Sequence, residues 1–132
     1  MRTWAAALAL TWAAATPAGA AVDWTPFRDT AVIEIRTEDP DGAARETKVW
    51  VVVLDAAYVR TNDSRWLANI RRGSPVELHA AGVTLPVRAR EVDDAVTQAR
   101  VEEAFLAKYG LVQRILSAVR LREPTVLRLD PI

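Results

Sequence analysis

The chain has 132 residues, with 17 basic and 17 acidic side chains and no cysteine. This length corresponds to one small domain, since domains typically contain about 100–150 residues. The balanced charge argues against a nucleic-acid partner, because general nucleic-acid binding depends on excess positive charge. The lack of cysteine excludes disulfide bonds, zinc–thiolate sites and a thiol nucleophile.

The first twenty residues have the pattern of a secretory signal peptide. Arg2 precedes an almost uninterrupted apolar run over residues 4–15, and Ala18-Gly19-Ala20 forms a cleavage motif. The run is shorter than the roughly 20 residues of a membrane anchor. We therefore expect residues 1–20 to be removed and residues 21–132 to be exported to the periplasm or the medium, without a stable membrane anchor. The alternative is a misassigned start codon and a cytoplasmic protein that begins near Val22.

Six segments rich in β-branched and apolar residues predict short strands. The run from Val49 to Leu54 is apolar on both faces, which indicates a strand that is central or covered on both sides. The segments Asp39-Pro40-Asp41-Gly42 and Ala81-Gly82 predict tight turns. The six strands are expected over residues 30–37, 45–54, 58–61, 76–80, 83–92 and 124–129.

Helix start and stop signals predict helices between some of these strands. They are a turn that starts at Thr25-Pro26, a short helix from Arg65 to Gly73, a longer helix from Asp93 or Asp94 to Tyr109, stopped by Gly110, and a second short helix over residues 111–119. Antiparallel strands dominate, and no strand–helix–strand alternation is present. The pattern favours a mainly β fold, a small closed or nearly closed barrel with flanking helices.

The best candidate for a binding site follows the third predicted strand. Thr61, Asn62 and Ser64 lie where this strand ends, and Arg65 begins the short helix. The first N–H groups of a helix lack internal partners, and the helix dipole is positive there, so the segment suits a phosphate or another anion. The alternative is that Ser64 only caps the helix, a role that requires no ligand.

The order of these segments resembles the flavin-binding split barrels of the pyridoxamine-phosphate-oxidase type. The cofactor segment of that family has an aromatic residue, Thr-Asn, a two-residue spacer, Ser-Arg-Lys and a short helix. Here Tyr58 precedes Thr61-Asn62, the spacer is Asp63 alone, Ser64-Arg65 follows, and Trp66 stands in the lysine position. The resemblance implies a six-stranded antiparallel split barrel over residues 21–132.

The chain is also similar to the deazaflavin-dependent nitroreductase branch of these barrels. That branch has Arg-Thr-Thr-Pro before its second strand and Trp-x-x-Asn on the helix. Arg45, Thr47, Trp66 and Asn69 occupy the matching positions, with Lys48 in place of the proline. The whole arrangement resembles most a small branch that is a domain of unknown function.

The resemblance implies a flavin-type cofactor and its contacts. The phosphate or ribityl tail would lie at the start of the short helix, and the ring edge would lie along the strand from Thr47 to Trp50. Because Trp66 replaces the family's lysine, the phosphate contacts would lack one positive charge. The implied cofactor-binding residues are Thr47, Lys48, Trp50, Thr61, Asn62, Ser64, Arg65 and Trp66.

Two functions are compatible with this resemblance. The first is an oxidoreductase of unknown substrate in which FMN, or a deazaflavin coenzyme if the protein is cytoplasmic, moves hydride. The second is a non-catalytic binding module for haem, another small ligand or no cofactor. His79, the single histidine, is the candidate haem or metal contact, although a histidine at the surface or satisfied within the protein is several times more frequent. The resemblance and the small core also predict a homodimer with the cofactor groove near the interface.

Overall fold

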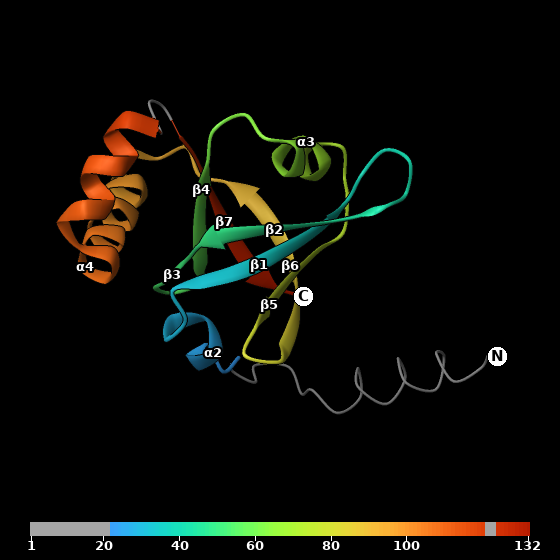
Figure 1. Cartoon of the computed structure of the whole chain (residues 1–132), viewed down its shortest axis with the longest axis horizontal. Helices are drawn as coiled ribbons and strands as arrows, with labels where there is room; N and C mark the ends of the chain where they lie inside the picture. The colour runs from blue at the N-terminus through green and yellow to red at the C-terminus, as the bar shows by residue number, and fades with distance from the viewer. Residues whose placement is uncertain (1–21, 121–123) are drawn as a thin grey trace.

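A computed structural model of the chain describes residues 22–120 and 124–132, and the side chains within residues 22–110 and 124–132 (Figure 1). The signal peptide expected over residues 1–20 lies outside the described residues. Among the described residues, no helix is both long enough and apolar enough to cross a membrane.

Seven antiparallel strands form one curled sheet in the order β2-β1-β5-β6-β7-β4-β3 (Figure 1). The mainly β fold with flanking helices is therefore as predicted, with seven strands in place of six. The strands are β1 (Val32–Glu38), β2 (Ala44–Trp50), β3 (Val52–Val53), β4 (Ala57–Thr61), β5 (Val76–Ala80), β6 (Val83–Glu91) and β7 (Thr125–Pro131).

The extra strand arises because the single strand predicted over residues 45–54 is interrupted at Val51. β2 pairs with β1, whereas β3 pairs with β4, so one continuous stretch of chain supplies both edges of the sheet. The backbone groups of Val51 bond to α4 (Ala95–Arg120) instead of to a strand. Its N–H donates to Tyr109 Oη at 3.0 Å, and its carbonyl accepts from Lys108 Nζ at 2.8 Å.

Three helices flank the sheet, and their ends follow the expected signals. α2 (Thr25–Arg28) and α3 (Arg65–Arg71) lie at opposite ends of the curled sheet, and α4 packs outside it (Figure 1). Asp94 Oδ2 accepts from the Thr97 N–H at 2.8 Å and so caps the start of α4. Gly110 has φ 80° and interrupts α4, which confirms the predicted end of the first helix at Tyr109 and the second helix that follows.

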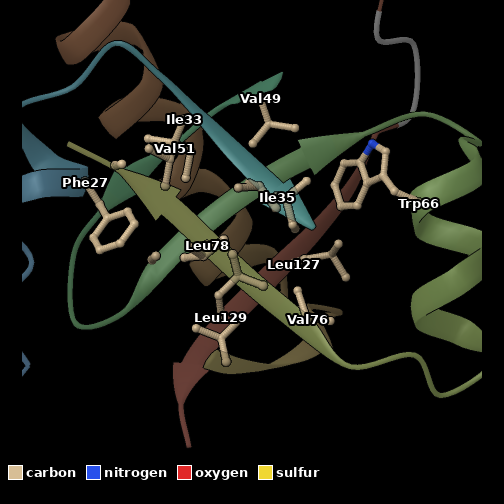
Figure 2. Close-up of a cluster of buried hydrophobic side chains, with 14 of the residues drawn as sticks. Phe27, Ile33, Ile35, Val49, Val51, Trp66, Val76, Leu78, Leu127 and Leu129 are labelled. Atoms are coloured by element: carbon tan, nitrogen blue, oxygen red, sulfur yellow. The ribbon is translucent and has the colours of Figure 1, made fainter. Parts of the chain in front are cut away.

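Two buried clusters hold the sheet and the helices together. The first fills the inside of the curled sheet and includes Phe27, Ile35, Leu78 and Leu127 (Figure 2). The second lies between the sheet and α4 and is built on Tyr58, Phe105 and neighbouring apolar residues. In β4 and β7, neighbouring apolar residues alternate between these two clusters, as the period of a β-strand requires.

Candidate functional site

The chain between β4 and α3 is fixed by two hydroxyl groups. Ser64 has an extended backbone, and its Oγ accepts from the Leu67 N–H at 3.2 Å. Thr61 Oγ1 lies 3.0 Å from Ser64 Oγ and 2.8 Å from the Asn62 carbonyl oxygen. Ser64 therefore caps α3, as the capping alternative predicted, and Thr61 supports the cap. Asn62 is exposed in the loop between them.

Arg65 and Trp66 are neighbours in sequence but lie in different environments, because successive residues of a helix point about 100° apart. Trp66 is only 5% exposed and belongs to the cluster inside the sheet. Figure 2 shows its indole ring directed from α3 toward the strands. Arg65 is exposed and, within the described part of the chain, makes no hydrogen bond or ion pair. Of the two, only Arg65 can offer a charge to a ligand at this place.

The three candidates on β2 do not share a face. Thr47 points to the same side as the buried Val49, whereas Lys48 and Trp50 point to the opposite side. Trp50 stacks on Tyr109 of α4, with ring centroids 4.4 Å apart and an angle of 8° between the rings. The structure therefore places Trp50 under α4 and leaves Lys48 exposed across from Glu34. The eight candidate residues do not form one cluster in this conformation.

A groove of about 450 Å³ opens between the β1–β2 turn and α3, within the usual size range of ligand pockets. Of the eight candidates, Arg65 alone lines it. The sequence comparison pointed to Arg45 and Asn69 as family positions, but it did not identify Asp39 or Arg72 as part of a site. The lining residues are Asp39, Pro40, Asp41, Arg45, Arg65, Ala68, Asn69 and Arg72.

One sequence signal could have identified the α3 side of the groove. Ala68, Asn69 and Arg72 lie three, four and seven residues after Arg65, which places the four residues on one face of a helix. The other side of the groove depends on contacts between segments about 30 residues apart, which no local pattern indicates.

Asp39 lies at the centre of the contacts between the turn and α3. Its Oδ1 accepts from Arg45 Nε at 2.7 Å and from Asn69 Nδ2 at 2.9 Å. Asn69 is 1% exposed and also donates to Thr37 Oγ1 at 3.0 Å. The Arg45 guanidinium, then the Asn69 amide and the more distant Arg65 charge, hold the pKa of the Asp39 carboxyl below its usual range. Asp39 is therefore an ionised carboxylate inside the groove at neutral pH.

Three guanidinium groups retain unused donors in the groove. Arg45 uses its Nε for Asp39, and its two Nη atoms have no hydrogen-bond partner within the described chain. Arg72 uses Nη2 to donate to the Glu38 carbonyl at 3.1 Å. Arg65 uses none of its donors on a described residue. Guanidinium groups bind phosphates and carboxylates through paired, charge-assisted hydrogen bonds, so the groove can hold an anion.

His79 lies away from this groove, on β5. Its Nδ1 is 3.1 Å from Thr84 Oγ1, and its Nε2 is 3.6 Å from Glu77 Oε1. Within the described ranges, no group of three or more His, Asp or Glu side chains is placed to hold a metal ion. His79 and the groove are therefore separate features.

The curled antiparallel sheet and its flanking helices form the fold of the pyridoxamine-phosphate-oxidase-like split barrels. The chain belongs to the family described as "Uncharacterized protein conserved in bacteria (DUF2255)", whose model matches residues 24–129. No match was found among curated proteins.

Solved structures of several split barrels are similar to this chain. The haem storage protein HutZ from Vibrio cholerae has a TM-score of 0.62 at 18% identity, covering 77% of this chain and 82% of HutZ. A pyridoxinephosphate oxidase family protein from Clostridium acetobutylicum, related to general stress protein 26 of B. subtilis, has a TM-score of 0.61 at 12% identity, covering 78% and 76%. An F420-H2-dependent reductase has a TM-score of 0.60 at 14% identity, covering 76% and 94%. Identities this low show a shared fold.

Proposed function

We propose that this protein binds a flavin-type cofactor and that the groove between the β1–β2 turn and α3 receives its phosphate group. The observation that carries the proposal is Arg65, a cation that lines the groove and has no ion pair within the described chain. Arg72 and the Nη atoms of Arg45 offer further donors. An exposed arginine held next to a phosphate gains charge-assisted bonds that a solvated arginine lacks.

The groove fits such a group with one difference from the family resemblance. The position of the family's lysine is occupied by Trp66, which is buried in the core and cannot contact a phosphate. Arg72, the C-cap of α3, lies about two turns beyond Arg65, lines the same groove and supplies a cation that compensates for this loss. Thr61 and Ser64 shape the start of α3 through the hydrogen bond between their hydroxyl groups and the cap of the Leu67 N–H.

Bound flavin would supply hydride transfer, and the protein would then act as an oxidoreductase. The residues of this chain would orient and hold the cofactor. The similar structures support a redox or cofactor-binding role in general terms, since they include a pyridoxinephosphate oxidase family member, an F420-H2-dependent reductase and a haem storage protein. We keep a non-catalytic binding module as the second candidate, because the similar structures include a haem storage protein.

The absorption spectrum of the protein purified from its native host tests this proposal. We expect flavin absorption bands that disappear on reduction. A Soret band would instead identify a haem-binding module. A colourless preparation that also fails to bind added FMN would contradict the flavin proposal and leave the second candidate.

The choice between FMN and a deazaflavin coenzyme depends on the compartment. We propose FMN, because the N-terminal pattern around Arg2 and Ala18-Gly19-Ala20 is that of an exported protein. N-terminal sequencing of the protein from its native cells tests this choice. A chain that begins at Ala21 supports export, whereas intact Met1 in the cytoplasm would favour the deazaflavin coenzyme.

A further inference from the structure

Asp39 is a fixed negative charge on the wall of the groove. Its side chain is 21% exposed, and two donors from different elements, Arg45 Nε and Asn69 Nδ2, hold its Oδ1. Its Oδ2 makes no hydrogen bond with a described residue. A ligand in the groove therefore meets a carboxylate oxygen that cannot rotate away without breaking both bonds.

The charges around the groove can balance only a small anion. Three guanidiniums and two carboxylates line it, an excess of one positive charge. Arg45 is already paired with Asp39 at 2.7 Å, so Arg65 and Arg72 are the cations left for a ligand. With Asp41 also present, the net excess stays at one, and a phosphate monoester, with about −1.5 to −2 charges at neutral pH, already exceeds it. A diphosphate carries still more negative charge, which the ionised carboxylates of Asp39 and Asp41 oppose.

We infer that Asp39 is a specificity-determining residue, which restricts the groove to ligands with a single terminal phosphate and disfavours diphosphates. The inference rests on the proposed function, because it concerns the same groove. Among flavins, it selects FMN over FAD. Asp41 also lines the groove, but its side chain is exposed, and its Oδ1 accepts from the Ala43 N–H in the turn. Water screens an exposed carboxylate more strongly, so Asp39 should dominate the selection.

The test compares Asp39→Asn with Asp41→Asn, which removes the same charge from the same groove. Asparagine at position 39 keeps an oxygen that can accept from Arg45 and Asn69. Calorimetry with inorganic phosphate and with pyrophosphate measures the ratio of the two affinities for each protein. We expect Asp39→Asn to shift this ratio toward pyrophosphate by about tenfold and Asp41→Asn to shift it by less than about threefold, as like-charge repulsion near a partly buried group predicts.

Parallel titrations with FMN and FAD separate this inference from the proposed function. If the phosphate ratio shifts as expected but FMN does not bind, the selectivity inference stands and the flavin proposal fails. If FMN binds the wild-type protein but Asp39→Asn changes neither ratio by more than about twofold, the inference is wrong and the flavin proposal stands. Equal shifts for the two variants, or no binding of either inorganic anion to any of the three proteins, would also overturn the inference. Melting curves without ligand check that both variants are folded.

Discussion

Arg45 Nε donates to Asp39 Oδ1 at 2.7 Å across the turn that joins β1 to β2, and Asn69 of α3 donates to the same oxygen. These three residues attach α3 to the sheet, and all three also line the groove. Arg65 lines the groove without taking part in these bonds. Substitutions can therefore separate the residues that maintain the fold from Arg65, for which we propose a role in ligand binding.

Asn69→Ala should lower the free energy of unfolding by about 2 kcal/mol. The buried amide donates to Thr37 and to Asp39, and its loss leaves the buried Thr37 hydroxyl without this donor. Urea denaturation measures the change. Ala68→Ser is the matched control, because position 68 is exposed on the same helix and should change stability by less than about 0.5 kcal/mol. Equal effects at the two positions would show that the Asn69 bonds contribute nothing to stability.

Ser64→Ala should cost about 1 kcal/mol of stability, because it removes the acceptor for the Leu67 N–H at the start of α3. Ser64→Asp retains an acceptor and should restore most of the loss. Arg65→Ala should leave the melting temperature of the ligand-free protein nearly unchanged, since Arg65 makes no hydrogen bond or ion pair with a described residue. Thermal unfolding of the three variants decides the matter. If Arg65→Ala lowers the melting temperature as much as Ser64→Ala does, Arg65 contributes to the stability of the fold.

Asp39 should make the stability of the protein sensitive to acid. The pKa of its carboxyl is lowered in the fold, first by the hydrogen bond from Arg45 and next by that from Asn69. A lowered folded pKa stabilises the protein above the unfolded pKa of about 3.9, and this contribution is lost as the pH falls through the folded pKa. Wild type should therefore exceed Asp39→Asn in urea midpoint at pH 7, and the difference should shrink below about pH 4. A difference that stays constant down to the lowest pH at which both proteins fold would contradict this origin.

Lys108→Met should lower the free energy of unfolding by about 2–3 kcal/mol. Lys108 Nζ donates to the carbonyls of Phe27, Thr30 and Val51 at 3.2, 2.9 and 2.8 Å, and so joins α4 to α2 and to the break between β2 and β3. Chemical denaturation measures the loss. Lys48→Met is the matched control, because Lys48 is exposed and should be nearly neutral for stability. If Lys108→Met leaves the free energy of unfolding unchanged, water replaces the ammonium group at these carbonyls without loss of stability.

Most of the fold could be predicted from the sequence because local signals determine it. The turn at Asp39–Gly42 is confirmed by the bond from the Gly42 N–H to the Asp39 carbonyl at 2.9 Å, and Gly42 has a positive φ, as is common for the residue that follows the centre of such a hairpin turn. The division of the strand at Val51 could not be predicted. It depends on Lys108 and Tyr109, which lie 57 and 58 residues further along the chain.

The site was less predictable than the fold, because it depends on which residues share a face after folding. The resemblance identified Arg65 and the Thr61–Ser64 loop, but it grouped Thr47 with Lys48 and Trp50, which the strand places on opposite sides. Trp66 is adjacent to Arg65 in sequence, yet it is a core residue. Asp39 and Arg72 line the same groove only because the fold places the β1–β2 turn beside α3, which the sequence alone does not indicate.

Calorimetric titration with FMN of wild type and Arg65→Ala tests the central claim most directly. Arg88→Ala is the control, since Arg88 is exposed and lies outside the groove lining. We expect Arg65→Ala to weaken FMN binding by about 1.5–3 kcal/mol, the contribution of a charge-assisted hydrogen bond, and Arg88→Ala to leave it unchanged. Riboflavin, which lacks the phosphate, should bind wild type and Arg65→Ala almost equally. If wild type shows no heat with FMN and inorganic phosphate does not compete, the flavin assignment is wrong and only the split-barrel fold remains.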